Sequence, residues 1–271
     1  TTMFELLQYD FFQNALISTI LISICCGLVG TYIVAKRMVF ISGGITHASF
    51  GGLGLSYYLG LSPMLGATVF AQLAALGILF LGENKKFRED SLIGIFWSAG
   101  MAIGILFIYL TPGYAPNLIS YLFGNILTVT TGQIILTGVL CLIVVLFFAC
   151  FYRPLFYIAF DKEYSQTHHV HVNILDIAIT MIIALCIVVC LKLAGIILII
   201  SYLTIPQAIA GLFYKNFTQQ LVASSLISMI GSVAGLFIAA TLQTPTGATI
   251  VVCFLLLFVL SWGWTRINHS A

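Results

Sequence analysis

The sequence predicts an all-α protein, a polytopic bundle of about nine membrane-spanning helices, with eight as the alternative count. Of the 271 residues, 61% are hydrophobic and only 7% are charged, whereas soluble domains carry about 25% charged residues. Apolar runs of about 20 residues, the length that crosses a bilayer, follow one another through a single predicted domain, 1–271. This composition excludes a water-soluble fold, and the net charge of +2 gives no indication of nucleic-acid binding.

The first four spans are bounded by polar segments of different kinds. The first span ends at the basic pair Lys36-Arg37, and Ser62-Pro63 marks a tight turn after the second. The most charged segment of the chain, 83–90, must lie in water, and it separates the third span from the fourth. The four predicted spans are 11–35, 39–61, 64–81 and 91–110.

The remaining five spans follow a loop rich in proline and glycine at 111–117. A second polar segment, 153–173, separates the fifth span from the sixth, and the seventh is interrupted at Pro206. A turn at 243–248 leads into the last span, which ends near Trp264. The fifth to eighth spans are predicted at 133–152, 174–191, 195–213 and 219–242.

The basic residues predict the orientation, because lysine and arginine are enriched in cytoplasmic loops. If the spans alternate, nine of the ten basic residues fall on one side of the membrane, and only Lys192 falls on the other. We therefore expect the N-terminal end outside and the C-terminal end in the cytoplasm. The nine residues are Lys36, Arg37, Lys85, Lys86, Arg88, Arg153, Lys162, Lys215 and Arg266.

A lone imidazole, His47, lies within the second span, in the stretch 41–52. At helical spacing it shares a face with Gly43, Gly51 and Gly54. Such a face either lets another backbone approach closely or leaves room beside the imidazole. An ionisable group at this depth is costly unless it faces protein or water, so His47 is a candidate functional residue. The alternative is a histidine that packs against a neighbouring helix.

The polar segment 153–173 begins with an amphipathic stretch and then becomes charged. Asp161 suits a helix N-cap and Glu163 suits the first turn, which predicts a short surface helix at about 162–168. This helix is either a solvated connector or a docking surface for a cytoplasmic motor. Its histidines lack the spacing and companions of a zinc site, so a solvated or partner-facing cluster is preferred over a metal site. These histidines are His168, His169 and His171.

Seven cysteines all fall within apolar runs, and no CxxC spacing occurs. Cys186 and Cys190 share a helix face, so they either bind a soft metal or pack as small buried thiols, and packing is the preferred interpretation. Asp176 lies one turn into the sixth span, near the cytoplasmic side. We expect it to cap a helix or to pair with a basic residue rather than to take part in transport.

No enzymatic motif is present: the sequence contains no HExxH, no GxSxG and no phosphate-binding GxxxxGK[ST]. The chain is therefore not expected to hydrolyse a nucleotide by itself. His47 is essentially the one ionisable residue at depth in the predicted spans, which is too few for a proton-coupled carrier that relies on acidic groups within the membrane.

Six segments, in this order, resemble the membrane permease subunit of the bacterial ATP-binding-cassette (ABC) importers for zinc, manganese and iron, the family that includes the zinc-uptake permease. The similarity runs nearly from end to end. The segments are KRMVFISGGITHASFGG (36–52), SLIGIFWSAGMAIGILF (91–107), YLFGNIL (121–127), FDKEYSQTHHVHVNILD (160–176), LKLAGIILIISYLTIPQAIA (191–210) and PTGATIVV (245–252).

The resemblance implies a homodimeric permease of the bacterial inner membrane that docks a cytoplasmic ATPase and receives metal from an extracytoplasmic binding protein. It implies a coupling helix at about 157–171 that carries the docking residues Phe160, Asp161, Glu163, Tyr164 and His169. It also places His47 in the ion path as a transient ligand, with Gly43, Thr46, Gly51 and Pro206 lining the path.

One position departs from the family pattern. The family usually places an aspartate four residues before this histidine, whereas this chain has Gly43. Without the carboxylate, metal binding at His47 is expected either to be weaker or to be completed by Thr46, backbone carbonyls at the glycine pair, water or the second copy. In the coupling helix, a glycine is common in the family where His169 stands.

The sequence hypothesis is an importer permease that moves a divalent transition metal inward by alternating access and holds no permanent cofactor. Zinc is the first choice, because a neutral imidazole suits it, and manganese and iron are the alternatives. A self-contained metal channel or secondary carrier is the alternative of another class. The same architecture carrying a metal chelate or a cobalamin-like compound is a third.

Overall fold

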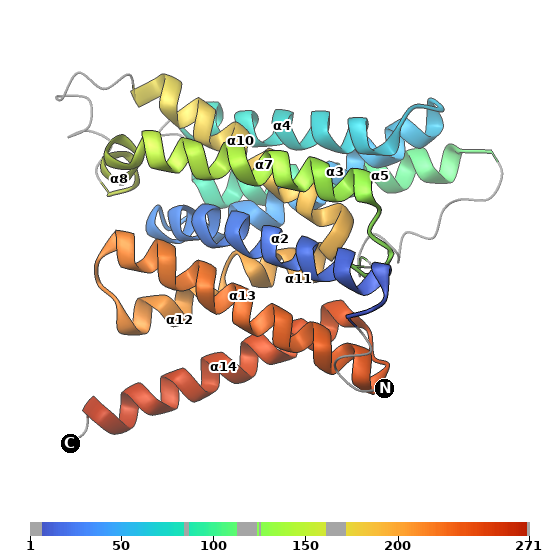
Figure 1. Cartoon of the computed structure of the whole chain (residues 1–271). Coiled ribbons are helices and arrows are strands. Elements are labelled where there is room, and N and C mark those ends of the chain that lie inside the picture. The colour runs from blue at the N-terminus through green and yellow to red at the C-terminus, as the bar shows by residue number, and fades with distance from the viewer. Residues whose placement is uncertain (1–6, 84–86, 113–123, 125, 161–171, 270–271) are drawn as a thin grey trace.

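The computed structural model describes residues 7–83, 87–112, 124, 126–160 and 172–269, and within these ranges every regular element is a helix. The helices run back and forth along one bundle axis (Figure 1). Their bounds are α2 (Asp10–Ala35), α3 (Val39–Tyr58), α4 (Pro63–Gly82), α5 (Glu89–Leu110), η1 (Ile126–Thr128), α7 (Thr131–Cys150), α8 (Tyr152–Phe160), α10 (Val172–Ala194), α11 (Ile196–Tyr202), α12 (Ile205–Phe213), α13 (Phe217–Leu242) and α14 (Thr246–His269).

The predicted all-α membrane bundle is confirmed, and the helix bounds lie within a few residues of the predicted spans. Eight segments of the described chain are long and apolar enough to cross a membrane, with α11 and α12 counted together. Helix α3 is not among the eight, although it is 20 residues long, because its glycine, serine and histidine residues lower its hydropathy. Nine crossings, with α3 as the ninth, stay a prediction.

The helix ends that carry basic residues gather at one end of the bundle. The end of α2, the start of α5, α8, the α12–α13 connection and the end of α14 lie on the left of Figure 1. The end of α10, with Lys192 in its last turn, lies toward the opposite side. This arrangement agrees with the charge pattern from which the orientation was predicted; which end faces the cytoplasm stays a prediction.

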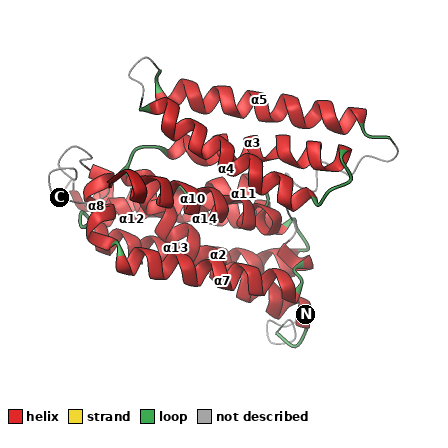
Figure 2. Cartoon of the chain, turned by 90° about the horizontal axis from the view of Figure 1, so that it is seen from above, coloured by secondary structure: helices red, strands yellow, loops and turns green. Residues whose placement is uncertain are grey.

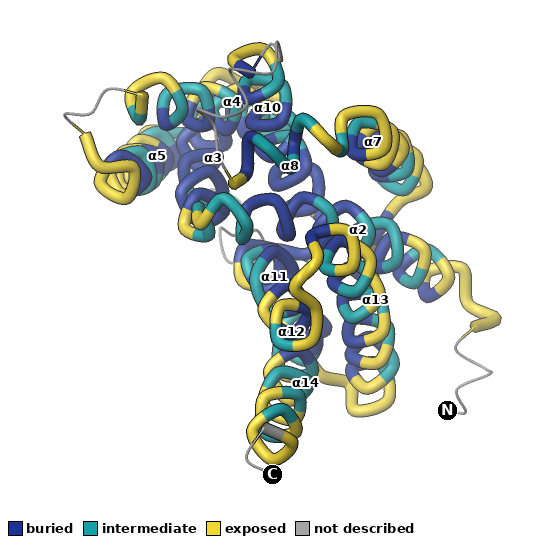
Figure 3. Tube along the Cα trace, turned by 90° about the vertical axis from the view of Figure 1, so that its left-hand side faces the viewer, coloured by how far each residue is buried: buried dark blue, intermediate teal, exposed yellow. Residues whose placement is uncertain are grey.

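Helix α3 packs between α4 and α5 through glycines (Figure 2). A Cβ added at Gly54 would lie 2.3 Å from the carbonyl oxygen of Gly104 in α5, and one added at Gly52 would meet the Gly66 carbonyl of α4. No larger residue fits at such contacts without a shift of backbone. Helices α2, α3 and α10 each contain more buried residues than any other helix, whereas the outer faces of α5, α7 and α14 are exposed (Figure 3).

The predicted pairing of Asp176 with a basic residue is confirmed. Lys36 Nζ, just after α2, donates to Asp176 Oδ1 of α10 at 2.6 Å. The Asp176 side chain is 2% exposed and that of Lys36 is 19% exposed. The carboxylate is therefore removed from water, whereas the Lys36 side chain keeps partial access to it. The ion pair joins the two central helices at one end of the bundle.

The predicted interruption of the seventh span lies slightly earlier than Pro206. Helix α11 ends at Tyr202 and α12 begins at Ile205, so the break falls at 203–204. Pro206 lies in the first turn of α12, where its missing N–H removes no intrahelical hydrogen bond. Gly195, with φ of +80°, separates α10 from α11, a conformation that favours glycine.

Candidate functional site

His47 lies in the middle of α3 and stacks on Trp97 of α5. The ring centroids are 4.2 Å apart and the ring planes differ by 12°. Both side chains are half-buried, and the Nδ1 atom of His47 is buried without a hydrogen-bond partner in the described part of the chain. A buried nitrogen with an unused lone pair or proton is costly, so this atom lacks a partner that a ligand could supply.

Trp97 occupies the space in front of Gly43. A Cβ added at Gly43 would lie 2.9 Å from Cζ3 of the indole ring, closer than ordinary contact. The residue at 43 must therefore be glycine as long as the indole stays where it is. Trp97 thus fills the space into which any larger side chain at position 43 would project.

Thr46 and Gly51, the two other predicted lining residues of α3, have packing partners. The buried hydroxyl of Thr46 donates to the Ser42 carbonyl of its own helix, which leaves its oxygen able to accept or to bind a cation. Gly51 faces α5, because a Cβ added there would lie 3.0 Å from the Gly100 carbonyl oxygen. The glycine face thus serves close backbone approach at Gly51 and Gly54.

Pro206 belongs to a different region of the bundle. Its helix, α12, packs on α2, α13 and α14, whereas α3 packs mainly on α4 and α5. The neighbouring Gln207 is buried, and its Nε2 donates to the carbonyls of Cys26 at 2.9 Å and Tyr202 at 3.1 Å. These two hydrogen bonds hold the break between α11 and α12 in contact with α2. The structure therefore does not bring Pro206 beside His47.

The predicted docking region is described only at its start. Phe160 ends α8, is 60% exposed, and packs its ring against Phe156 and Phe217. Helix α8 covers Tyr152–Phe160, so the described helix begins before the predicted coupling helix. The remaining predicted residues lie outside the described part of the chain, and docking stays a prediction. They are Asp161, Glu163, Tyr164 and His169, together with His168 and His171.

Sequence reasoning did not identify Trp97 as the neighbour of His47. The two residues lie 50 positions apart on different helices, and no spacing rule connects them. The one available signal was indirect: Trp97 lies in a segment that carried the family resemblance, and it is one of three tryptophans in the chain.

Comparison with known proteins agrees with this architecture. A membrane protein of Synechocystis sp. is 39% identical over 264 residues, which cover 97% of this chain and 94% of that protein. The manganese transport system membrane protein MntC of Halalkalibacterium halodurans is 31% identical over 258 residues, 95% of this chain and 88% of that protein. The structure of PsaBC from Streptococcus pneumoniae in complex with Fab matches with a TM-score of 0.84 and 30% identity, covering 96% of this chain and 95% of that one.

The ABC 3 transport family matches residues 8–264, from the segment before α2 to the last turns of α14. The resemblance drawn from the six sequence segments is confirmed by this match. The multi-helix bundle places the protein in the plasma membrane, as in its relatives. The chain therefore belongs to the ABC 3 transport family and is a membrane permease of that family.

Proposed function

We propose that the chain is the permease subunit of an ABC importer for a divalent transition metal, with manganese as the first cargo. The observation that carries this proposal is the similarity, over nearly the whole length of both proteins, to MntC, which is named for manganese transport. The sequence hypothesis placed zinc first. Zinc becomes the second candidate, because nothing in the comparisons favours it.

His47 is the proposed ligand for the ion in transit. A metal ion binds a ring nitrogen in the plane of the imidazole, whereas Trp97 covers a face of that ring. The stack therefore orients the imidazole and leaves the ring edge with Nδ1 free of the indole. Manganese prefers oxygen ligands, which Thr46, backbone carbonyls, water or a second copy of the chain would add.

The energy for transport would come from a separate ATPase, since the sequence holds no phosphate-binding motif. The segment 160–169 is the proposed docking surface, next to α8. Helix α8 packs on both α2 and α10, which the Lys36–Asp176 ion pair also joins. A displacement of the docked segment would thus reach the two central helices directly. A binding protein outside and a second copy of the chain complete the proposed importer.

The test is uptake of radioactive manganese and zinc into proteoliposomes that contain the chain, its ATPase and the binding protein. The expected result is ATP-dependent manganese uptake that exceeds zinc uptake and is lost in His47→Ala. Ser98→Ala is the matched control, because Ser98 is exposed on α5 next to Trp97 and bonds within its own helix. Uptake by the chain without ATPase would instead support a channel or a secondary carrier, and undiminished uptake in His47→Ala would make His47 a packing residue.

A further inference from the structure

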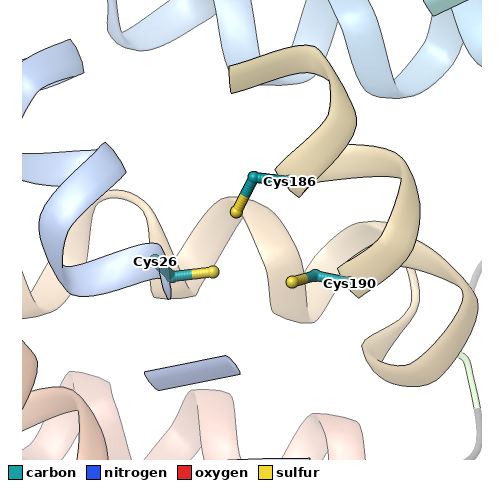
Figure 4. A group of neighbouring side chains, drawn as sticks. All are labelled: Cys26, Cys186 and Cys190. Carbon is teal, nitrogen blue, oxygen red and sulfur yellow. The ribbon is translucent and has the colours of Figure 1, made fainter. Parts of the chain in front are cut away.

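Three buried cysteines from two helices converge in the core of the bundle. Cys26 comes from α2, and Cys186 and Cys190 lie one turn apart on α10 (Figure 4). Their sulfur atoms all lie within 4.8 Å of one another, and each residue is 0% exposed. Figure 4 shows the three side chains pointing toward a common centre. In the sequence, the pair Cys186 and Cys190 of α10 offered only two sulfur ligands, and Cys26 supplies the third.

The three thiols are removed from solvent and have further thiols near them. The thiol of Cys25 lies near that of Cys186 and near that of Cys141 from α7, so five cysteines line one region of the core. Within the described residues, the three-membered group contains sulfur alone, with no carboxylate and no imidazole. The Cys26 backbone is held by Gln207, whose Nε2 donates to the Cys26 carbonyl oxygen at 2.9 Å.

The geometry is close to that of a bound ion. For three atoms no more than 4.8 Å apart, there is a point at most about 2.8 Å from all of them, and a metal–thiolate bond is about 2.3 Å long. A shift of about 0.5 Å per sulfur is therefore the most that binding requires, within the reach of small χ1 changes. Because α2 and α10 already hold the ligands, little ordering remains to oppose binding.

The number and softness of the ligands select the ion. Structural zinc is almost always four-coordinate, whereas this group offers three sulfur atoms. Thiolate sulfur favours soft ions such as Cu(I) over manganese or magnesium, which favour oxygen. A monovalent ion also suits an apolar core: one cysteine that loses its proton, two neutral thiols and one Cu(I) give no net charge, and a net buried charge is costly.

We propose that Cys26, Cys186 and Cys190 form a binding site for one soft monovalent cation of the Cu(I) class, separate from the ion path at His47. Binding exchanges one thiol proton for the cation and involves no change of oxidation state. The bound ion would cross-link α2 and α10 in the core, in addition to the Lys36–Asp176 ion pair at the helix ends. It would restrict the relative motion of these two helices.

The test is an anaerobic titration of the purified chain in detergent with Cu(I) buffered by bicinchoninate. We expect one tightly held Cu(I) per chain, a sulfur-to-copper charge-transfer band in the near ultraviolet, and a shell of sulfur ligands alone by X-ray absorption. Cys186→Ala/Cys190→Ala should lower the affinity at least about tenfold. Cys150→Ala/Cys253→Ala is the matched control, because these cysteines are exposed and half-buried, outside the group.

The proposal is overturned if the unmodified chain retains no Cu(I) against bicinchoninate, or if its bound copper shows nitrogen or oxygen ligands. These two readings need no variant, so they hold even where the cysteine pair variant fails to fold. Equal affinity in a monodisperse Cys186→Ala/Cys190→Ala protein and in the control would also overturn it. Manganese uptake is a separate measurement, and its failure would leave the copper site untouched.

Discussion

The Lys36–Asp176 ion pair gives the sharpest stability prediction, because its two partners differ in exposure. Lys36→Met leaves the Asp176 carboxylate, 2% exposed, without its ammonium partner. Breaking a buried pair in this way costs about 3–5 kcal/mol. Asp176→Asn leaves an ammonium group on a side chain that is 19% exposed. Lys36 can still reach water, so the loss is that of a charged hydrogen bond, about 1.5–3 kcal/mol.

The double variant decides whether this reasoning is correct. Lys36→Met/Asp176→Asn leaves no buried charge, so it should be more stable than Lys36→Met alone, although it carries one more substitution. Unfolding of the four proteins by SDS in mixed micelles, followed by circular dichroism, measures the free energies. Lys192→Met, an exposed lysine of the same helix as Asp176, is the control and should change little. If the two single losses simply add in the double variant, the ion pair has no coupling and the argument fails.

Three further outcomes are expected. Gly43→Asp alone should lower the yield of folded protein in size-exclusion chromatography, because Trp97 fills the space that the new side chain needs. Adding Trp97→Ala should restore this yield and strengthen manganese binding in a competition assay. An unchanged yield in Gly43→Asp would contradict the contact. Gly54→Ala should lower the free energy of unfolding in SDS by about 1–3 kcal/mol, because its Cβ would lie 2.3 Å from a carbonyl oxygen of α5. Gly94→Ala is the control and should lower it by nothing, because the space beside Gly94 is open. Equal stability of the two variants would refute the close approach. Ser224→Ala removes the hydroxyl that bonds to α2 and should cost about 0.6 kcal/mol, at most about 1.7, so a larger loss would indicate a role beyond this bond.

The stacked pair of His47 and Trp97 changes how the departure at Gly43 is understood. From the sequence, the absence of a carboxylate at position 43 indicates the loss of a metal ligand. In the structure, an indole ring fills the same space and lies flat on the imidazole. The indole thus gives His47 an aromatic neighbour, which orients the ring without supplying a ligand. Under the proposed function, the oxygen ligands of a manganese ion would come from other groups, and uptake by the double variant Gly43→Asp/Trp97→Ala tests this directly.

The sequence by itself determined the membrane bundle, the helix boundaries to within a few residues, and the family. In lipid, every backbone N–H and C=O must be satisfied within the segment, so a run of about 20 apolar residues has one common solution, the helix. Local signals such as Lys36-Arg37 and Ser62-Pro63 then mark where each helix stops. The same local chemistry indicated that Asp176 would cap a helix or pair with a basic residue, although it did not say which residue.

Only the tertiary structure decided which side chains meet. Three of these contacts join different helices. Lys36 pairs with Asp176, Trp97 stacks on His47, and Cys26 adds the third thiol beside the cysteine pair of α10. Helical periodicity assigns a residue to a face of its own helix but does not state which helix lies opposite. That choice depends on the packing of small residues across the whole bundle, such as Gly54.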